Sequence, residues 1–433
     1  MSFLLVALFL SLLSVPSVFS FSFILLGFWL YYQFDCCMYM NSPMEFSLMS
    51  DELSLFMTYM MTFVLFISFV YSLYLKAGLK LTVVFMSMLI FCFGVFTTNN
   101  LFMLYFYYES SLLPILYIII KWGSYPERSL SALMLLIYTS IFTFPFILVM
   151  FTTYSIYGTF LFSNNFTCCS APMGALASFI VFCTFAVKLP VYGLHFWLPM
   201  AHVEAPTFGS MILAGVLLKL GGVGLIRCIN YVDMVFMKSS MLSYLLVFML
   251  YVTVVCTFQS DFKRLVAYSS VSHMMAIPLL YLANTAISMK SILMLMLFHG
   301  LSSPILFMLV GVVYSLYSTR QLIMIRGLVL LSPLTSLLMV LAFFFTMSAP
   351  PFPSFVSEVY FLVSCFSLSN VVIVVFILFT FLSMIYNLNW LTAMVFSSAS
   401  CSTLAFNLTY MNFFPMMVSF LLCVPISLIV VLM

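Results

Sequence analysis

The sequence contains very little charge. Only 5% of its 433 residues are Asp, Glu, Lys or Arg, against about 25% in a typical soluble domain. Hydrophobic residues make up 66% of the chain, and the mean hydropathy is +1.28. A soluble fold of this length could not cover its surface with so few polar groups, so lipid must solvate most of that surface. These values exclude a soluble protein and predict an all-α polytopic membrane protein.

Several binding signatures are also missing. The formal net charge is only +3 and no basic run occurs, so we expect no nucleic-acid partner. The 11 cysteines show no metal-ligand spacing, and a single Cys within an apolar run usually acts as a small hydrophobic residue. No glycine-rich dinucleotide fingerprint and no iron–sulfur spacing occurs. We therefore expect this chain to bind no cofactor and no metal itself.

Long apolar runs follow one another along the whole sequence. A helical span needs roughly 20 apolar residues. The first run has no basic start, so we expect a membrane anchor and not a cleaved signal; it is long enough for two short spans. Counting that run twice, the sequence predicts about fourteen transmembrane helices. The runs are 3–32, 53–75, 81–97, 101–120, 130–153, 172–198, 207–229, 241–258, 265–283, 290–317, 328–365, 369–392 and 413–432.

The charges in the predicted loops are distributed unequally between the two membrane faces. When the spans alternate, one face receives only Arg227, Lys238 and Lys290. By the positive-inside rule, the other face is the cytoplasm-like side, which is the matrix side in a mitochondrion. Its basic residues are Lys76, Lys80, Lys121, Arg128, Lys263, Arg264, Arg320 and Arg326.

Some ionisable residues fall inside the apolar runs. A charge at the centre of a membrane helix costs about 2.5–3.5 kcal/mol on insertion scales, so such residues must pair, contact internal water or be neutral. Structural ion pairs between helices are one explanation. Their spread over several helices favours another, a row of titratable groups that passes protons along. The candidates are Glu109, Lys188, Lys219, His273, His299 and Glu358.

Two of these charges lie beside prolines that should interrupt a helix. Pro190 follows Lys188, and Pro350, Pro351 and Pro353 precede Glu358. Proline lacks the backbone N–H and breaks the helical ladder, which is tolerated in a membrane where the freed groups line a cavity. Broken helices that carry charge are typical of transporters with inverted repeats. Because burial favours the neutral form of a lysine, Lys188 could lose and regain a proton.

Other features allow more than one explanation. The glycines after Lys219 permit close helix packing, which is their simpler role. Asp261 is expected to cap a helix and to pair locally as a structural charge. Each of the two buried histidines has hydroxyl neighbours and could be either a hydrogen-bonded core residue or a relay. A zinc site is a further reading, with the ligands His195, His202 and Glu204.

Longer motifs around these residues resemble a known family. The segments that carry the resemblance are Tyr108-Glu109, Val187–Pro199 (VKLPVYGLHFWLP), Ala201–Pro206 (AHVEAP), Leu217–Gly222 (LLKLGG), Ala267–Met274 (AYSSVSHM) and His299–Leu301 (HGL). They are similar to subunit 4 of mitochondrial NADH:ubiquinone oxidoreductase, respiratory complex I, and the similarity covers about 60% of the chain, residues 98–365. The resemblance implies an antiporter-like fold of fourteen helices with two inverted repeats, whose seventh and twelfth helices are broken.

The resemblance also implies roles for individual residues. Glu109 and Lys188 match the family's glutamate–lysine pair, and Lys219 matches its central lysine. His299 matches the connecting histidine, and Glu358 matches the terminal charge on the second broken helix. Bacterial relatives carry Lys where Glu358 stands, which favours a mitochondrial member. Met200 occupies a position where the family usually has Lys, so no role for a charge is carried over there.

Together these observations predict a proton-translocating subunit of the membrane arm of NADH:ubiquinone reductase, without a redox centre of its own. The resemblance implies that NADH, FMN, iron–sulfur clusters and ubiquinone are bound by partner subunits. It further implies that neighbouring antiporter-like subunits are partners, and that the lipid bilayer is the mitochondrial inner membrane. The alternatives are a stand-alone cation/proton antiporter and a passive scaffold. We expect N-terminal helices in 1–97, the proton-translocation core in 98–365 and C-terminal helices in 366–433.

Overall fold

A computed structural model of the protein describes residues 51–74, 80–158, 160–162, 174–229, 234–350 and 352–397. The predicted runs 3–32 and 413–432 lie outside these residues, so the expected count of fourteen helices cannot be followed over the whole chain. Within the described part, the chain is helical, with two isolated β-bridges as its only strand-like pairing.

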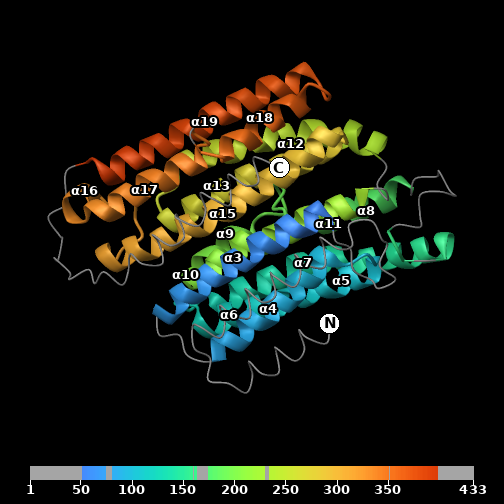
Figure 1. Ribbon diagram of the computed structural model, residues 1–433, viewed down its shortest axis with the longest axis horizontal. Helices are drawn as coiled ribbons and strands as arrows, with labels where there is room; N and C mark the ends of the chain where they lie inside the picture. The colour runs from blue at the N-terminus through green and yellow to red at the C-terminus, as the bar shows by residue number, and fades with distance from the viewer. Residues whose placement is uncertain are drawn as a thin grey trace.

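Long helices lie side by side with nearly parallel axes, as Figure 1 shows. Apolar side chains on several faces of each helix explain this arrangement, because each helix can face other helices on one side and lipid on the other. The helices of the first half are α3 (Glu52–Tyr74), α4 (Lys80–Thr97), α5 (Leu101–Ser110), α6 (Leu112–Trp122), α7 (Arg128–Tyr157), α8 (Ala175–Lys188), α9 (Trp197–Glu204), α10 (Thr207–Ile212), the π-helix η1 (Leu213–Leu217) and α11 (Leu218–Arg227).

The second half continues the same pattern. Its helices are α12 (Met234–Thr257), α13 (Phe262–Met274), α14 (Ala276–Ala283), α15 (Ala286–Tyr317), α16 (Leu328–Leu331), α17 (Pro333–Thr346), α18 (Ser354–Cys365) and α19 (Asn370–Val395). Some consecutive elements form one continuous span: α5 with α6, α10 with η1 and α11, and α13 with α14.

Seven helices in the described part of the chain are long and apolar enough to cross a membrane. They are Glu52–Ser72, Leu101–Trp122, Arg128–Ile156, Thr207–Arg227, Phe262–Ala283, Ala286–Tyr317 and Asn370–Val395. Five shorter apolar helices accompany them: Leu81–Thr97, Ala175–Lys188, Met241–Thr257, Pro333–Thr346 and Ser354–Cys365. The prediction of a helical, polytopic membrane protein is therefore confirmed.

The prolines interrupt helices where the sequence predicted. α8 ends at Lys188, Leu189 and Pro190 form a turn, and α9 starts only at Trp197. The predicted span 172–198 is therefore wrong as a single helix, because the missing N–H of Pro190 ends the ladder in its middle. The second interruption separates α17 from α18, and Ser348 in this break has a φ of 55°, a left-handed conformation that is uncommon for serine.

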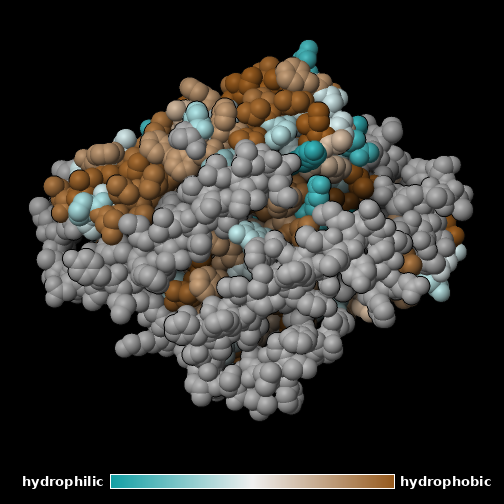
Figure 2. Space-filling model, in the orientation of Figure 1, coloured by the Kyte–Doolittle hydropathy of each residue, from teal (hydrophilic) through white to brown (hydrophobic). Residues whose placement is uncertain are grey.

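The outer faces of the peripheral helices are apolar. Exposed side chains on α19 include Val371, Val374, Ile377, Phe381 and Met384. Figure 2 shows the corresponding hydrophobic surface along the edge where α19 lies. A soluble protein rarely exposes an apolar patch of this extent. Lipid is the environment that fits it.

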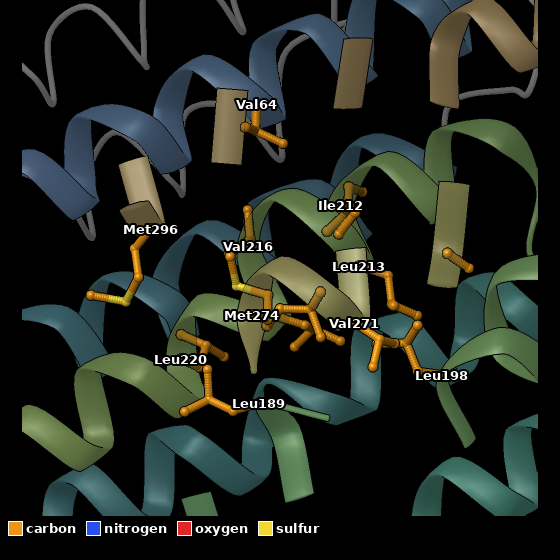
Figure 3. Close-up of a cluster of buried hydrophobic side chains, with 14 of the residues drawn as sticks. Val64, Leu189, Leu198, Ile212, Leu213, Val216, Leu220, Val271, Met274 and Met296 are labelled. Carbon is orange, nitrogen blue, oxygen red and sulfur yellow. The ribbon is translucent and has the colours of Figure 1, made fainter. Parts of the chain in front are cut away.

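The centre of the described part is closely packed around the span α10–η1–α11. Residues 208–225 of this span are buried, and Figure 3 shows Ile212, Leu213, Val216 and Leu220 among neighbours from other helices. Gly221 allows α8 to approach closely, because a Cβ atom there would lie 2.8 Å from the carbonyl oxygen of Phe185 in α8. The glycines after Lys219 thus serve packing, as their simpler reading predicted.

We predict that Gly221→Val destabilises the protein, because the added side chain meets backbone atoms of α8 that cannot rotate away. Overpacking of this kind costs about 1–3 kcal/mol. The measurement is the thermal unfolding midpoint of the purified protein in detergent. Gly174→Val is the matched control, since a Cβ there meets no atom within 4 Å. Equal midpoints for the two variants would contradict the close contact.

Candidate functional site

The first cluster of buried charge forms where α8 ends. Lys188 is the last residue of α8 and only 1% exposed. Its Nζ donates a hydrogen bond of 2.8 Å to the carbonyl oxygen of Tyr108 and lies 3.2 Å from the centroid of that tyrosine ring. The Tyr108 hydroxyl in turn donates to the carbonyl oxygen of Thr184, one turn before Lys188. The ring and the carbonyl of one residue thus hold the ammonium group.

Glu109 lies beside this cluster without bonding to it directly. The carboxylate of Glu109 and the ammonium of Lys188 interact electrostatically. The ion pairs among the described residues, however, are Arg227–Asp51 and Arg264–Asp261, and neither includes them. The Glu109 Oε1 atom is buried and has no hydrogen-bond partner. The structure therefore brings the predicted glutamate and lysine together without a direct ion pair.

The second cluster starts at Lys219, which is fully buried. The π-helical turn η1 precedes it and widens the backbone, as π-bulges at functional sites often do. The Lys219 Nζ donates to the carbonyl oxygen of Ala214 at 2.5 Å and lies 2.9 Å from Nδ1 of His299. The central lysine and the histidine of α15, predicted from separate motifs, are in direct contact.

A cavity lined by both polar and apolar side chains extends from His299 to Glu358. The ring centroids of His299 and His273 are 6.1 Å apart. Both rings and Glu358 line a cavity of about 40 Å³, together with serines that include Ser302, Ser303, Ser348, Ser354 and Ser357. One water needs roughly 10–15 Å³ of such volume and two to four polar partners, so this cavity suits a short chain of waters. Lys219 thus contacts His299, and His299, His273 and Glu358 line one cavity; these four residues are called the polar row below.

The two clusters are separated by apolar packing. α8 packs against α11, and the contact that Gly221 makes with Phe185 and Leu189 lies in this interface. Leu189 and Leu220 appear close together in Figure 3. Among the described side chains, no hydrogen bond or ion pair links Lys188 to Lys219. Proton exchange between the clusters requires water to enter this layer.

Two residues near the cytoplasm-like face are more deeply buried than the sequence suggested. His202 is fully buried, stacks on Phe307 with ring centroids 4.6 Å apart, and has both ring nitrogens unpartnered. Lys263, predicted to lie in a loop, is 5% exposed and belongs to α13, which begins at Phe262, three residues before the predicted start at 265. In the described residues, no three of the His, Cys, Asp and Glu side chains form a metal-binding group, so His195, His202 and Glu204 do not.

Some polar residues of the interior were not found from the sequence. Tyr386 and Asn387 on α19 are 1% and 2% exposed. The Tyr386 hydroxyl and the Asn387 Nδ2 have no hydrogen-bond partner. The adjacent pair of polar residues within the apolar segment 370–395 was the available signal.

Asp261 behaves as expected in part, since it pairs with Arg264 at 3.3 Å but makes no side-chain cap.

Known proteins share this sequence pattern. A family model described as NADH:quinone oxidoreductase/Mrp antiporter, transmembrane, matches residues 98–385. NADH-ubiquinone oxidoreductase chain 4 of Lumbricus terrestris is 36% identical over 312 residues, which cover 71% of this chain and 69% of the relative. The protein of the same name from Artemia franciscana is 35% identical over 313 residues, covering 71% of this chain and 78% of the relative.

Solved structures share the fold. A chain of respiratory complex I from Thermus thermophilus, determined with bound NADH, superimposes with a TM-score of 0.84 at 20% identity and covers 98% of this chain and 93% of its own. A chain of the Mrp complex from Dietzia sp. DQ12-45-1b gives a TM-score of 0.73 at 18% identity, and the match covers 81% of this chain and 67% of that chain. At these identities the superpositions show the fold alone. They confirm the antiporter-like fold predicted from the sequence.

We predict that an experimental map of the cavity at high resolution contains two or three ordered waters between His299 and Glu358, given its volume of about 40 Å³ and its serine lining. Ser303→Leu should displace them, because the larger apolar side chain fills the space and removes a hydroxyl. The measurement is the density in the cavity of the unchanged protein and of the variant. A cavity without ordered water in the unchanged protein would contradict a continuous connection along the polar row.

Proposed function

Because the chain belongs to the NADH-ubiquinone oxidoreductase chain 4 family, we propose that it translocates protons in the membrane arm of that enzyme through its row of buried ionisable residues. Electron transfer from NADH to ubiquinone in other subunits drives this movement. The observation that carries the proposal is the contact between Lys219 and His299 at 2.9 Å, which opens into the cavity that reaches Glu358. A proton leaving the lysine has an acceptor within hydrogen-bond distance and, beyond it, a cavity with room for water.

The residues form two groups, each of which can hold an exchangeable proton and is called a store here. Lys188 is the first, and the Glu109 carboxylate favours its charged form. Lys219 is the second, and His299, His273 and Glu358 receive its proton in turn. When water fills the apolar layer between α8 and α11, a proton can pass from the first store to the second. When that layer is dry, each store is isolated, and backflow is blocked.

The finer architecture follows from the family. We propose about fourteen transmembrane helices arranged as two inverted repeats, with α8–α9 and α17–α18 as the two corresponding broken helices. The proton-translocation core comprises residues 98–365, flanked by N-terminal helices in 1–97 and C-terminal helices in 366–433. The equivalent placement of Lys188 and Glu358 beside the breaks supports this symmetry, since broken helices at the midplane are a transporter device.

The redox chemistry belongs to other subunits in this proposal. NADH, FMN, iron–sulfur clusters and ubiquinone bind to partners, and this chain contributes to an oxidoreductase without carrying out electron transfer itself. Neighbouring antiporter-like subunits contact it within the membrane. Its location is the mitochondrial inner membrane, which agrees with the mitochondrial type of residue at Glu358.

A stand-alone cation/proton antiporter is the alternative, and the shared fold with the Mrp chain is the observation that favours it. The sequence relatives support the complex I subunit. We predict that the protein, solubilised in mild detergent, migrates with NADH dehydrogenase activity and flavin in native electrophoresis, because its polar row has no driving reaction of its own. Isolation as a single polypeptide that exchanges Na⁺ or K⁺ for protons in vesicles would support the antiporter instead.

We predict that Lys219→Arg in the assembled complex reduces NADH-driven proton pumping at least tenfold. Arginine keeps the positive charge but cannot release a proton at working pH, so it separates proton transfer from a structural role of charge. The measurement is proton uptake by inverted membrane vesicles during NADH oxidation. The matched control is Lys121→Arg, because Lys121 is exposed and lies outside both clusters.

The same vesicles test the scaffold reading. A scaffold needs only the charge, so its pumping would survive Lys219→Arg while Lys219→Met would prevent assembly. Native electrophoresis of each variant shows whether the complex assembles. Normal pumping by an assembled complex with Lys219→Arg would remove the central lysine from the proposed path.

A further inference from the structure

A second cavity, of about 300 Å³, lies at the cytoplasm-like face and takes no part in the polar row. It forms where the ends of α3, α6 and α15 meet the junction of α9 with α10 and the start of α13. Two cations, Lys263 and Arg320, line it together with Tyr71, Trp122, Thr207 and Tyr314. A volume of this size is at the lower end of that of ligand pockets.

Lys263 directs its ammonium group towards this junction. It is 5% exposed, and its Nζ donates to the carbonyl oxygens of Val203 at 3.2 Å and of Ala205 at 2.5 Å. An ammonium group has three N–H donors, so these two bonds leave one for a further acceptor. The bonds to α9 also fix the position of the charge, which reduces the entropy that a ligand would lose by ordering it.

Arg320 is held in place in a similar way. Its Nη1 donates to the same carbonyl oxygen of Val203 at 3.2 Å. The guanidinium carbon lies 4.1 Å from the ring centroid of Tyr125 and 5.9 Å from that of Tyr314. The rings and the carbonyl orient the guanidinium plane, and most of its five N–H donors remain for a ligand.

Neither cation forms an ion pair in the described part of the chain, although the Glu204 carboxylate lies near both. The ion pairs there are Arg227–Asp51 and Arg264–Asp261. Glu204 interacts with Lys263 and Arg320 through space but forms no ion pair with either. Glu204 supplies one carboxylate near two fixed, partly desolvated cations, so a further anion would lower the cost of burying the second positive charge. The site is therefore complementary to an oxyanion with several acceptor oxygens.

The other walls indicate what the anion is attached to. Ala205, Pro206, Val310 and Val312 give the cavity apolar sides. Tyr71, Trp122 and Tyr314 are amphipathic aromatic residues of the kind enriched at the level of lipid headgroups. Basic pockets between transmembrane helices on the cytoplasmic or matrix side suit anionic headgroups. Cations at one end and apolar walls at the other fit a phosphate that carries a hydrophobic body.

We propose that this cavity binds a phosphate oxyanion, with the headgroup phosphate of a membrane phospholipid as the source that its apolar walls favour. Arg320 and Lys263 hold the phosphate oxygens, Arg320 with two parallel N–H donors. The glycerol and the first carbons of the acyl chains lie along the valine and proline side. The bound lipid joins the ends of α6, α13 and α15 at this face.

The test uses the protein in the assembly in which it is purified, stripped of bound lipid by detergent exchange. In one arm, vesicles of phosphatidylcholine contain a trace of phosphatidic acid with a diazirine in its acyl chain, and labelled peptides are mapped by mass spectrometry. Diacylglycerol with the same diazirine is the control, because it has the acyl chains but no phosphate and so reports apolar binding alone. In the other arm, equilibrium dialysis measures retention of ³²P-labelled inorganic phosphate.

Arg320→Gln is the diagnostic variant, and Arg326→Gln is its matched control because Arg326 is exposed on the same face and does not line the cavity. We expect phosphatidic acid, but not diacylglycerol, to label peptides that line the cavity. Arg320→Gln should lower this labelling about tenfold or more, as expected for a lost hydrogen bond to a charged group. Ser124→Trp, at an exposed lining position, should block labelling by filling the entrance while leaving both cations in place.

The two arms distinguish the sources of phosphate. One possible result is that the protein retains ³²P-phosphate, that Arg320→Gln abolishes this retention, and that phosphatidic acid labels nothing. This result would support the oxyanion site and identify soluble phosphate as its ligand. Equal labelling by both diazirine probes, or no difference between Arg320→Gln and Arg326→Gln in either arm, would overturn the proposal. Since none of these measurements involves proton pumping, their outcome is independent of the proposed function.

Discussion

Buried ammonium groups in this fold replace the water that they lose with main-chain carbonyl groups. Lys188 bonds to Tyr108, Lys219 to Ala214, and Lys263 to Val203 and Ala205. A helix carbonyl oxygen can accept a second hydrogen bond, and these acceptors lie at or beside irregular backbone: before the α5–α6 junction, in the π-helical turn, and at the end of α9. The ammonium groups thus exchange bonds to water for bonds to carbonyl groups near interruptions of the helices.

This constraint explains why the polar groups occur in separate clusters. A carbonyl stabilises an ammonium group but accepts no proton from it, so it can hold charge in place without conducting it. Conduction needs a titratable neighbour, which Lys219 has in His299 and Lys188 lacks at bonding distance. The close helix contact at Gly221 keeps apolar side chains between the clusters. In the proposed path, carbonyl groups therefore hold the charge in place and titratable side chains pass the proton on.

The sequence predicted those features that follow from residue type and order. Apolar length predicted the helices between 51 and 397, and Pro190 predicted the end of α8. The motifs named Lys219 and His299 as separate candidates, and the structure places them in contact. The carbonyl acceptors could not be predicted, because every residue has a carbonyl and only the folded structure places a particular one beside an ammonium group. The burial of His202 and Lys263 was missed for a related reason, since the packing of α9 against α13 brings them inside.

The position of Lys188 over the face of Tyr108 has a mechanical consequence. The ring attracts the side chain more strongly while it is charged, since a neutral amine has no net charge to interact with the quadrupole of the aromatic face. Loss of the proton therefore weakens the interaction between the Tyr108 ring of α5 and Lys188, the residue at which α8 ends. The protonation state of this one amine therefore changes the strength of the contact between α5 and α8.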